Sequence, residues 1–345
     1  MEEVGKVGSA DREEDERGSD RENRGAGKKK TTMKKTKTKR SGKRKGGGKK
    51  NYWMGCLRVE SDERGNVDMT VDFPGERAEP THLVVMVNGL IGSAQNWRFA
   101  AKQLLKKYPE DLLVHCSKRN YSMLTFDGVD VMGQRLAEEV RSVIERHPSL
   151  RKISFVGHSL GGLIARSHCL VDCTRWKDLL LVFHGVLVER ENISFSLTKM
   201  MENLLCFSKC SALQCFKRCV AYANTSFDHL VGWSTSSIRR HNELPKLQRR
   251  SVSEKYPHIV NVEPPATAIN RNEDLSEANP VGFNNFDMEE EMIRGLTKLR
   301  WERIDVNFRG SIQRFLAHNT IQVKTKCIND AGTDVIQHMN DNFMP

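Results

Sequence analysis

The chain has 345 residues, of which 38% are hydrophobic, so it can build one sizeable α/β core and still carry unfolded segments. Its formal net charge of +11 comes from 55 Lys and Arg against 44 Asp and Glu. Residues 1–50 hold 18 basic and 9 acidic residues, a net charge of +9, which leaves +2 for the remainder. Nucleic-acid-binding domains usually carry their basic surplus on the folded surface, so we expect no specific nucleic-acid partner.

The first fifty residues are predicted to be a disordered, low-complexity tail, because they contain almost no large apolar side chains that would offset the entropy of ordering. Residues 28–50 contain 13 basic residues and no acidic ones. Four interpretations stay open for this stretch: a solvating tail, a nuclear-localisation signal, an RNA-binding arm, or a peripheral contact with an anionic membrane. Residues 51–80 are expected to be a linker with room for one extra strand.

Membrane insertion and secretion are not expected for this sequence. It has no run of 18 apolar residues, and the best candidate, Leu179 to Val188, is interrupted by His184. The first residues carry acidic clusters and lack the apolar core of a secretory signal. The 9 cysteines are therefore expected to be reduced thiols. These features predict a cytoplasmic protein, and they leave open a nuclear or membrane-associated location through the basic tail.

Residues 81–345 are predicted to form a domain of alternating strands and helices. His82 to Val87 is a continuous apolar, β-branched run, which is typical of a strand buried on both faces of a parallel sheet. Apolar residues at helical spacing follow from Trp97 to Leu105 and predict a helix. Leu112 to Cys116 is then expected to be a second, short strand.

The alternation continues with a long amphipathic helix and a third strand. The helix is expected to have Asp130 as its N-cap and to end before Pro148, and Lys152 to Gly157 predicts the strand. Such spacing indicates an α/β fold with a mostly parallel central sheet and helices on both faces. Residues 167–215 are predicted to be irregular, and residues near 245–288 to be a polar insertion.

A G-x-S-x-G motif with Ser159 at its centre stands between that third strand and a helix-compatible segment. In this context the serine is predicted to sit on a sharp strand-to-helix turn that lifts its hydroxyl above the sheet, as a nucleophile. Gly157 and Gly161 are expected to flank it because a side chain at either position would obstruct so tight a turn.

The same turn predicts an oxyanion hole made of backbone N–H groups. One donor is expected at Leu160, at the positive end of the following helix. The second is expected at Leu90, in the turn Asn-Gly-Leu that ends the first strand. Together these features favour the α/β-hydrolase fold.

The acid and the base of such a site follow the serine in chain order, each after a later strand. Asp228 comes shortly after a predicted strand that ends at Asn224, and His318 comes after a predicted strand from Trp301 to Phe308. We therefore predict Asp228 as the acid and His318 as the base. His338 and His229 stay open as alternative bases.

Several blocks of this sequence resemble the plant serine esterase family, a lipase-like branch of the α/β-hydrolases. The similar blocks are residues 82–90, 125–133, 157–162, 222–240 and 289–323. The resemblance implies hydrolysis of carboxylic esters, with acyl lipids as the substrate class.

The same resemblance also supports Ser159, Asp228 and His318 as the catalytic residues. One part of the family pattern is not found in this sequence. Members of the family have a further apolar strand that runs into a Thr-Pro-His-Leu-Gly turn, followed by a lid-like region. In this chain Leu179 to Val188 is the segment available to replace that strand. A shortened form that folds poorly and is inactive is the alternative.

The remaining residue clusters predict no metal and no cofactor. Cys206, Cys210, Cys215 and Cys219 lack the paired spacing of a structural zinc site and are expected to be packed thiols. The sequence thus predicts a serine hydrolase that cleaves acyl-lipid esters through an acyl-enzyme. The alternative is a catalytically silent scaffold whose basic tail binds an anionic membrane or nucleic acid.

Overall fold

A computed structural model describes residues 56–61, 67–72, 79–167, 179–184, 216–247, 253–265, 290 and 293–345. All of them belong to one compact unit, Trp53–Pro345. The predicted disordered tail and three of the four clustered cysteines lie outside the described residues, as does most of the segment predicted to be irregular.

The described residues form strands and helices in the following order. The elements are β1 (Cys56–Ser61), β2 (Val67–Asp72), β3 (His82–Val87), η1 (Ala94–Trp97), α1 (Arg98–Lys107), β4 (Leu112–Cys116), η2 (Ser122–Phe126), α2 (Val129–Arg146), β5 (Lys152–His158), α3 (Leu160–Ser167), β6 (Leu179–His184), β7 (Arg218–Asn224), α5 (Trp233–Ser236), η5 (His241–Glu243), β8 (Ile259–Glu263), β9 (Trp301–Val306), η6 (Ile312–Leu316), α7 (Ala317–Thr320), α8 (Lys326–Asn329), η7 (Asp330–Gly332) and α9 (Thr333–Asp341).

The strands form a single sheet in the order β1-β2-β4-β3-β5-β6-β7-β9-β8. The neighbours from β4 to β9 pair in parallel. The outer strands β1, β2 and β8 pair antiparallel with their neighbours. The sheet is therefore mixed, and the carboxyl ends of β4, β3, β5, β6, β7 and β9 meet at one edge.

Strand β6 is the central strand for which the sequence after the Ser159 motif offered a single candidate segment. It lies between β5 and β7 and pairs in parallel with both, with Phe155 opposite Leu181 and Val182 opposite Val220. The segment Leu179 to Val188 thus supplies the strand expected of it over Leu179–His184, and residues 185–188 lie outside the described residues.

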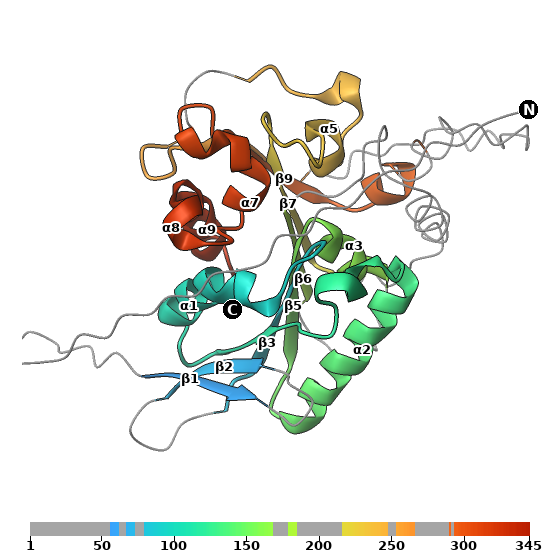
Figure 1. The fold of residues 1–345 in the computed structure, drawn as a ribbon, viewed down its shortest axis with the longest axis vertical. Helices are drawn as coiled ribbons and strands as arrows, with labels where there is room; N and C mark the ends of the chain where they lie inside the picture. The colour runs from blue at the N-terminus through green and yellow to red at the C-terminus, as the bar shows by residue number, and fades with distance from the viewer. Residues whose placement is uncertain are drawn as a thin grey trace, which may run out of the picture. The chain divides into compact units, whose positions relative to one another are not determined.

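Two hydrophobic layers hold the sheet, one on each face. Leu83 and Val85 of β3 pack in the layer that includes α2 and α3, while Val84 and Met86 pack in the layer that includes α1 and α9. This alternation follows from the period of two along a strand. Figure 1 shows α2 and α3 on one side of the central strands and α1 and α9 on the other.

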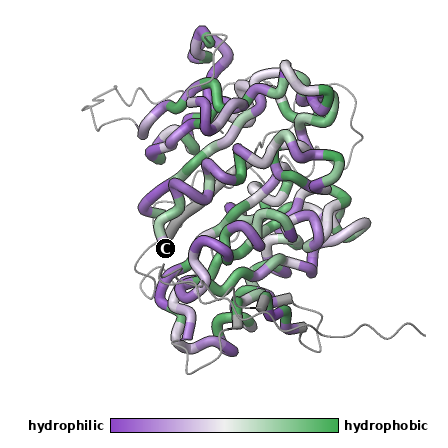
Figure 2. The backbone as a smooth tube through the Cα atoms, turned by 90° about the vertical axis from the view of Figure 1, so that its left-hand side faces the viewer, coloured by the Kyte–Doolittle hydropathy of each residue, from purple (hydrophilic) through white to green (hydrophobic). Residues whose placement is uncertain are grey.

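Helix α2 begins earlier than its sequence suggested. It starts at Val129 after Gly128, whose φ of +91° suits glycine, so Asp130 lies in the first turn and is not the N-cap. Hydrophobic and hydrophilic residues alternate along the helices (Figure 2), as expected for helices that bury one stripe. No helix in the described part of the chain is long and apolar enough to cross a membrane.

A buried charge cluster fastens the edge hairpin to the rest of the sheet. His115 of β4 is fully buried and lies between two carboxylates, with Nδ1 2.5 Å from Asp68 of β2 and Nε2 3.0 Å from Glu139 of α2. Burial by itself lowers the pKa of His115, but the hydrogen bonds to the two carboxylates raise it to about 9. His115 is thus a cation at neutral pH, and Arg146 adds a second cation 2.6 Å from Asp68.

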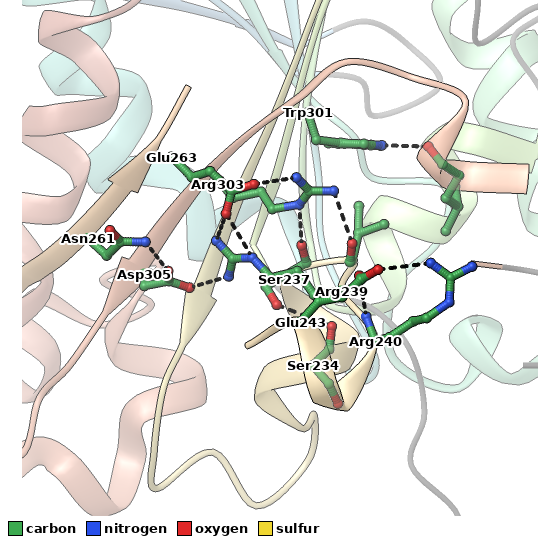
Figure 3. A network of polar contacts seen from close by, with 12 residues as sticks. Ser234, Ser237, Arg239, Arg240, Glu243, Asn261, Glu263, Trp301, Arg303 and Asp305 are labelled. Atoms are coloured by element: carbon green, nitrogen blue, oxygen red, sulfur yellow. Dashed lines mark hydrogen bonds and ion pairs between the residues drawn. The ribbon is translucent and has the colours of Figure 1, made fainter. Parts of the chain in front are cut away.

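A second polar network joins α5, β8 and β9 at the other edge (Figure 3). Asp305 of β9 is fully buried and accepts hydrogen bonds from Arg239 at 2.8 Å, from Asn261 at 2.8 Å and from the Trp233 indole at 2.7 Å. Arg239 also binds Glu263 of β8. These contacts hold the start of α5, and with it the end of the loop that follows β7. Strand β8 itself lies inside the segment that the sequence analysis expected to be a polar insertion.

Candidate active site

Ser159 sits directly between β5 and α3. Its φ of +54° falls in the left-handed region that residues with a side chain rarely adopt. Such a conformation costs on the order of 1–3 kcal/mol and persists only where the surroundings impose it. The backbone here is therefore a sharp strand-to-helix turn.

Three glycines let the backbone pack closely around this turn. A Cβ on Gly157 would lie 2.6 Å from the Gly162 Cα, and one on Gly161 would lie 2.2 Å from the Val87 carbonyl oxygen. A Cβ on Gly89 would lie 2.9 Å from the Cβ of Ser159. These distances are shorter than real contacts of a Cβ, so helix α3 and the end of β3 approach the turn more closely than other residues would allow.

The two residues expected to supply backbone donors for an oxyanion belong to the two segments that adjoin Ser159. Leu160 is the first residue of α3, where an N–H has no partner within the helix. Leu90 lies in the turn after β3, next to Gly89. This turn is held in place because Asn88 Nδ2 donates to the Asn120 carbonyl oxygen at 2.8 Å.

Asp228 lies in the loop after β7 and is anchored by its neighbours. Its carboxylate accepts hydrogen bonds from the backbone N–H groups of Leu230 and Val231, at 3.1 and 3.0 Å, and from Asn224 Nδ2 at 2.9 Å. Burial by itself raises the pKa of this carboxyl, but the hydrogen bond and charge of His318, together with these donors, hold it below its usual value. Asp228 is thus ionised at neutral pH.

His318 of α7 faces Asp228. Its Nδ1 lies 3.1 and 3.2 Å from the two carboxylate oxygens, and because Asp228 is ionised, the nitrogen donates. The His318 carbonyl oxygen accepts a hydrogen bond from Nε2 of His158 at 2.7 Å. The centroids of the two imidazole rings are 4.6 Å apart. Since His158 immediately precedes Ser159, the Asp228–His318 pair is attached to the turn that carries the serine.

The two alternative bases lie elsewhere. His338 of α9 is buried and its Nδ1 is 2.9 Å from the Tyr222 hydroxyl, and burial lowers its pKa. His229 is exposed. Among the described residues no hydrogen bond or ion pair joins either imidazole to the Asp228 carboxylate, although His229 is its neighbour in the chain, so the geometry favours His318.

Two contacts that position the candidate site were not predicted from the sequence, namely those of the His158 and Asn224 side chains. The signal for Asn224 was its place at the end of a strand four residues before Asp228. His158 gave no such signal, because its partner is 160 residues away along the chain.

The described residues contain no group of three or more His, Cys, Asp or Glu that could hold a metal ion. Cys219 is buried in β7, and burial raises the pKa of its thiol to about 12, so it is a neutral packed thiol. Cys206, Cys210 and Cys215 lie outside the described residues.

Residues 77–186 match the family described as "Putative serine esterase (DUF676)". This span contains β3, the Ser159 turn and β6, and it ends before Asp228 and His318. The protein named "Putative lipase ROG1" from Saccharomyces cerevisiae is 40% identical over 87 residues, which are 24% of this chain and 13% of the yeast protein. The chain thus matches a small fraction of that relative's length.

Solved structures also resemble part of the chain. The product of the gene lin2722 from Listeria innocua is 14% identical, and the match covers 46% of this chain and 77% of the other, with a TM-score of 0.32. The lipase BlEst2 from Bacillus licheniformis is 14% identical, with 45% and 70% covered and a TM-score of 0.33.

Proposed function

We propose that the protein is a serine hydrolase of the α/β-hydrolase fold that cleaves carboxylic acyl esters, with acyl lipids as its substrates. Ser159 is the nucleophile, His318 the base and Asp228 the acid. The observation that carries this proposal is the Asp228–His318 hydrogen bond, held against the strained turn at Ser159 by the contact from His158 to the His318 backbone.

The proposed reaction begins with a proton transfer. Asp228 holds Nδ1 of His318 protonated, which leaves Nε2 free to accept the proton of the Ser159 hydroxyl as the serine attacks the ester carbonyl. The ionised carboxylate also stabilises the imidazolium that forms. The same imidazolium then protonates the leaving alcohol, and an acyl-enzyme remains on the serine.

The negative oxygen of the tetrahedral intermediate needs donors that are already in place. The N–H groups of Leu160 and Leu90 are proposed for this role, because Gly89 brings the turn after β3 against Ser159. One such donor contributes on the order of 3 kcal/mol to transition-state stabilisation. Water then attacks the acyl-enzyme and His318 repeats its role as base, so the ester is converted to acid and alcohol without a cofactor.

Covalent labelling of the full-length chain by a fluorophosphonate probe tests this proposal. We expect one adduct on Ser159, loss of the adduct in Ser159→Ala, and hydrolysis of a p-nitrophenyl acyl ester by the unchanged chain alone. Ser142→Ala, on the outer part of α2, is the matched control and should label as the unchanged chain does. Absence of an adduct in protein that gives a cooperative unfolding transition would leave the silent scaffold as the better account.

A further inference from the structure

Large apolar side chains that face solvent gather on the loops around Ser159. One group, here called the η6 patch, consists of Leu230, Ile312, Phe315 and Leu316. Ile312 is 91% exposed and Phe315 is 59% exposed. Removing apolar surface of this size from water would be favourable, so both side chains are available for contact with a partner. Contiguous exposed apolar side chains of this kind mark an interaction surface.

The η6 patch is one face of a helical turn that leads into the proposed base. Ile312 and Phe315 stand at positions i and i+3 of the 3-10 helix η6 and so share a face, and Leu316 ends the helix two residues before His318. Phe315 packs edge-on against Phe227, with ring centroids 5.8 Å apart. The patch is therefore held in a defined place beside the site and is not a loose loop tip.

A second group lies on the loops after β3 and β4. This η2 patch consists of Ile91, Met123, Leu124 and Phe126, and Met123 is 71% exposed. The backbone N–H of Ile91 donates to the Thr125 hydroxyl at 3.0 Å, which joins the two loops.

The two patches stand on opposite sides of Ser159 at one edge of the sheet. The η2 patch follows the carboxyl ends of β3 and β4, and the η6 patch follows those of β7 and β9. These strands are parallel, and β5, which carries Ser159, lies between the two pairs in the strand order. A flat apolar partner at this edge would touch both patches and cover the proposed site.

The charge around the η6 patch indicates the partner. Four basic residues lie in 307–329, namely Arg309, Arg314, Lys324 and Lys326, and one acidic residue, Asp330, accepts a hydrogen bond from Gln313 of η6, so cations outnumber anions here. The Arg314 guanidinium lies over the Phe315 ring, 4.7 Å from its centroid, so apolar and cationic groups share one surface. Apolar side chains bordered by cations are suited to the interface of an anionic lipid layer.

We infer that the η6 and η2 patches dock the folded domain on an anionic lipid surface, with the Ser159 edge of the sheet facing the lipid. The inference rests on the proposed function in one respect, that the substrate is an acyl lipid held in that surface. It assigns membrane contact to the folded domain and does not need the basic tail.

Co-sedimentation with phosphatidylcholine vesicles, with and without phosphatidylserine, tests the docking. The full-length chain is compared with Ile312→Asp, Met123→Asp and a matched control, Met344→Asp, which changes a side chain that is 65% exposed and belongs to neither patch. We expect phosphatidylserine to increase binding, and each patch variant to lower the partition coefficient about tenfold or more. The control should stay within about twofold of the unchanged chain.

Three outcomes would overturn the inference. The first is binding by the patch variants equal to that of the control. The second is loss of binding when the basic residues of 28–50 are changed to Gln in the full-length chain while the patch variants still bind. The third is a change in the oligomeric state of the patch variants without a change in vesicle binding, because the patches would then join two copies of the chain.

The result is separable from the proposed function. Labelling of Ser159 without vesicle binding would remove the docking surface and leave the hydrolase. Vesicle binding by a chain that is not labelled would leave the docking surface and remove the hydrolase.

Discussion

Replacing Gly161 by Ala tests how closely the backbones pack at the Ser159 turn. The added Cβ would lie 2.2 Å from the Val87 carbonyl oxygen and 2.7 Å from that of Asn88. Ordinary contact begins near 3.4 Å, so the end of β3 and the start of α3 must separate by about 1.2 Å. Because the added Cβ would clash with the backbone carbonyl oxygens of both Val87 and Asn88, no side-chain rotation relieves the contact. We expect a loss of about 3 kcal/mol in unfolding free energy, at the upper end of typical overpacking costs.

Chemical denaturation and the rate of fluorophosphonate labelling measure the two consequences of this change. Separation of β3 from α3 also moves Leu90 away from Ser159, so labelling should slow by more than the unfolded fraction explains. Gly310→Ala is the matched control, since its Cβ would meet nothing within 4 Å, and it should be neutral or stabilising by up to about 1 kcal/mol. Unfolding free energies for the two variants within about 0.5 kcal/mol of each other would refute the close packing at the turn.

Two further predictions concern the acid and the buried cluster. Asp228→Asn should lower kcat toward a soluble ester roughly 10³- to 10⁴-fold with little change in KM, because His318 loses the anion that orients it. A decrease in kcat of less than about tenfold in steady-state kinetics would contradict that role. His115→Gln should lower the unfolding free energy at pH 6 by about 3 kcal/mol, because Asp68 and Glu139 lose their buried cation. In the unchanged chain the pKa of His115 is raised from 6.5 to about 9, so its contribution is fully present below pH 6.5 and is lost as the pH rises through about 9. Denaturation curves that do not change between about pH 7 and 10, or that change equally in the Gln variant, would refute this account.

The strands at the middle of the sheet were predictable because their signal is local. His82–Val87 is a continuous apolar run after its first residue, and Lys152–His158 has Ile153, Phe155 and Val156 in its middle. A Gly-containing turn follows each, which leaves few alternatives to a buried strand. Leu179–His184 was found by the same rule. The antiparallel edges were predicted less well: one extra strand was expected in residues 51–80, where the structure has β1 and β2, and β8 was not expected at all. A short strand such as Ile259–Glu263 becomes a strand through pairing with β9 and not through its own composition.

In the candidate site, too, the features with a local sequence signal were predicted and those that depend on long-range contacts were not. The Ser159 motif consists of five neighbouring residues, and Asp228 and His318 were predicted because each follows a predicted strand. The contact of His158 with the His318 backbone depends on how the chain folds back on itself. The same holds for the buried His115 cluster, whose partners lie 47 and 24 residues away along the chain.

The place of β6 in the sheet sets a length scale for the proposed catalytic relay. One strand stands between the strand that precedes Ser159 and the strand that precedes Asp228, so their backbones are separated by two inter-strand spacings, about 10 Å. In the proposed relay, the imidazole of His318 comes from beyond β9, contacts Asp228 and spans this separation toward Ser159, so the width of β6 is part of the distance that the relay must cover.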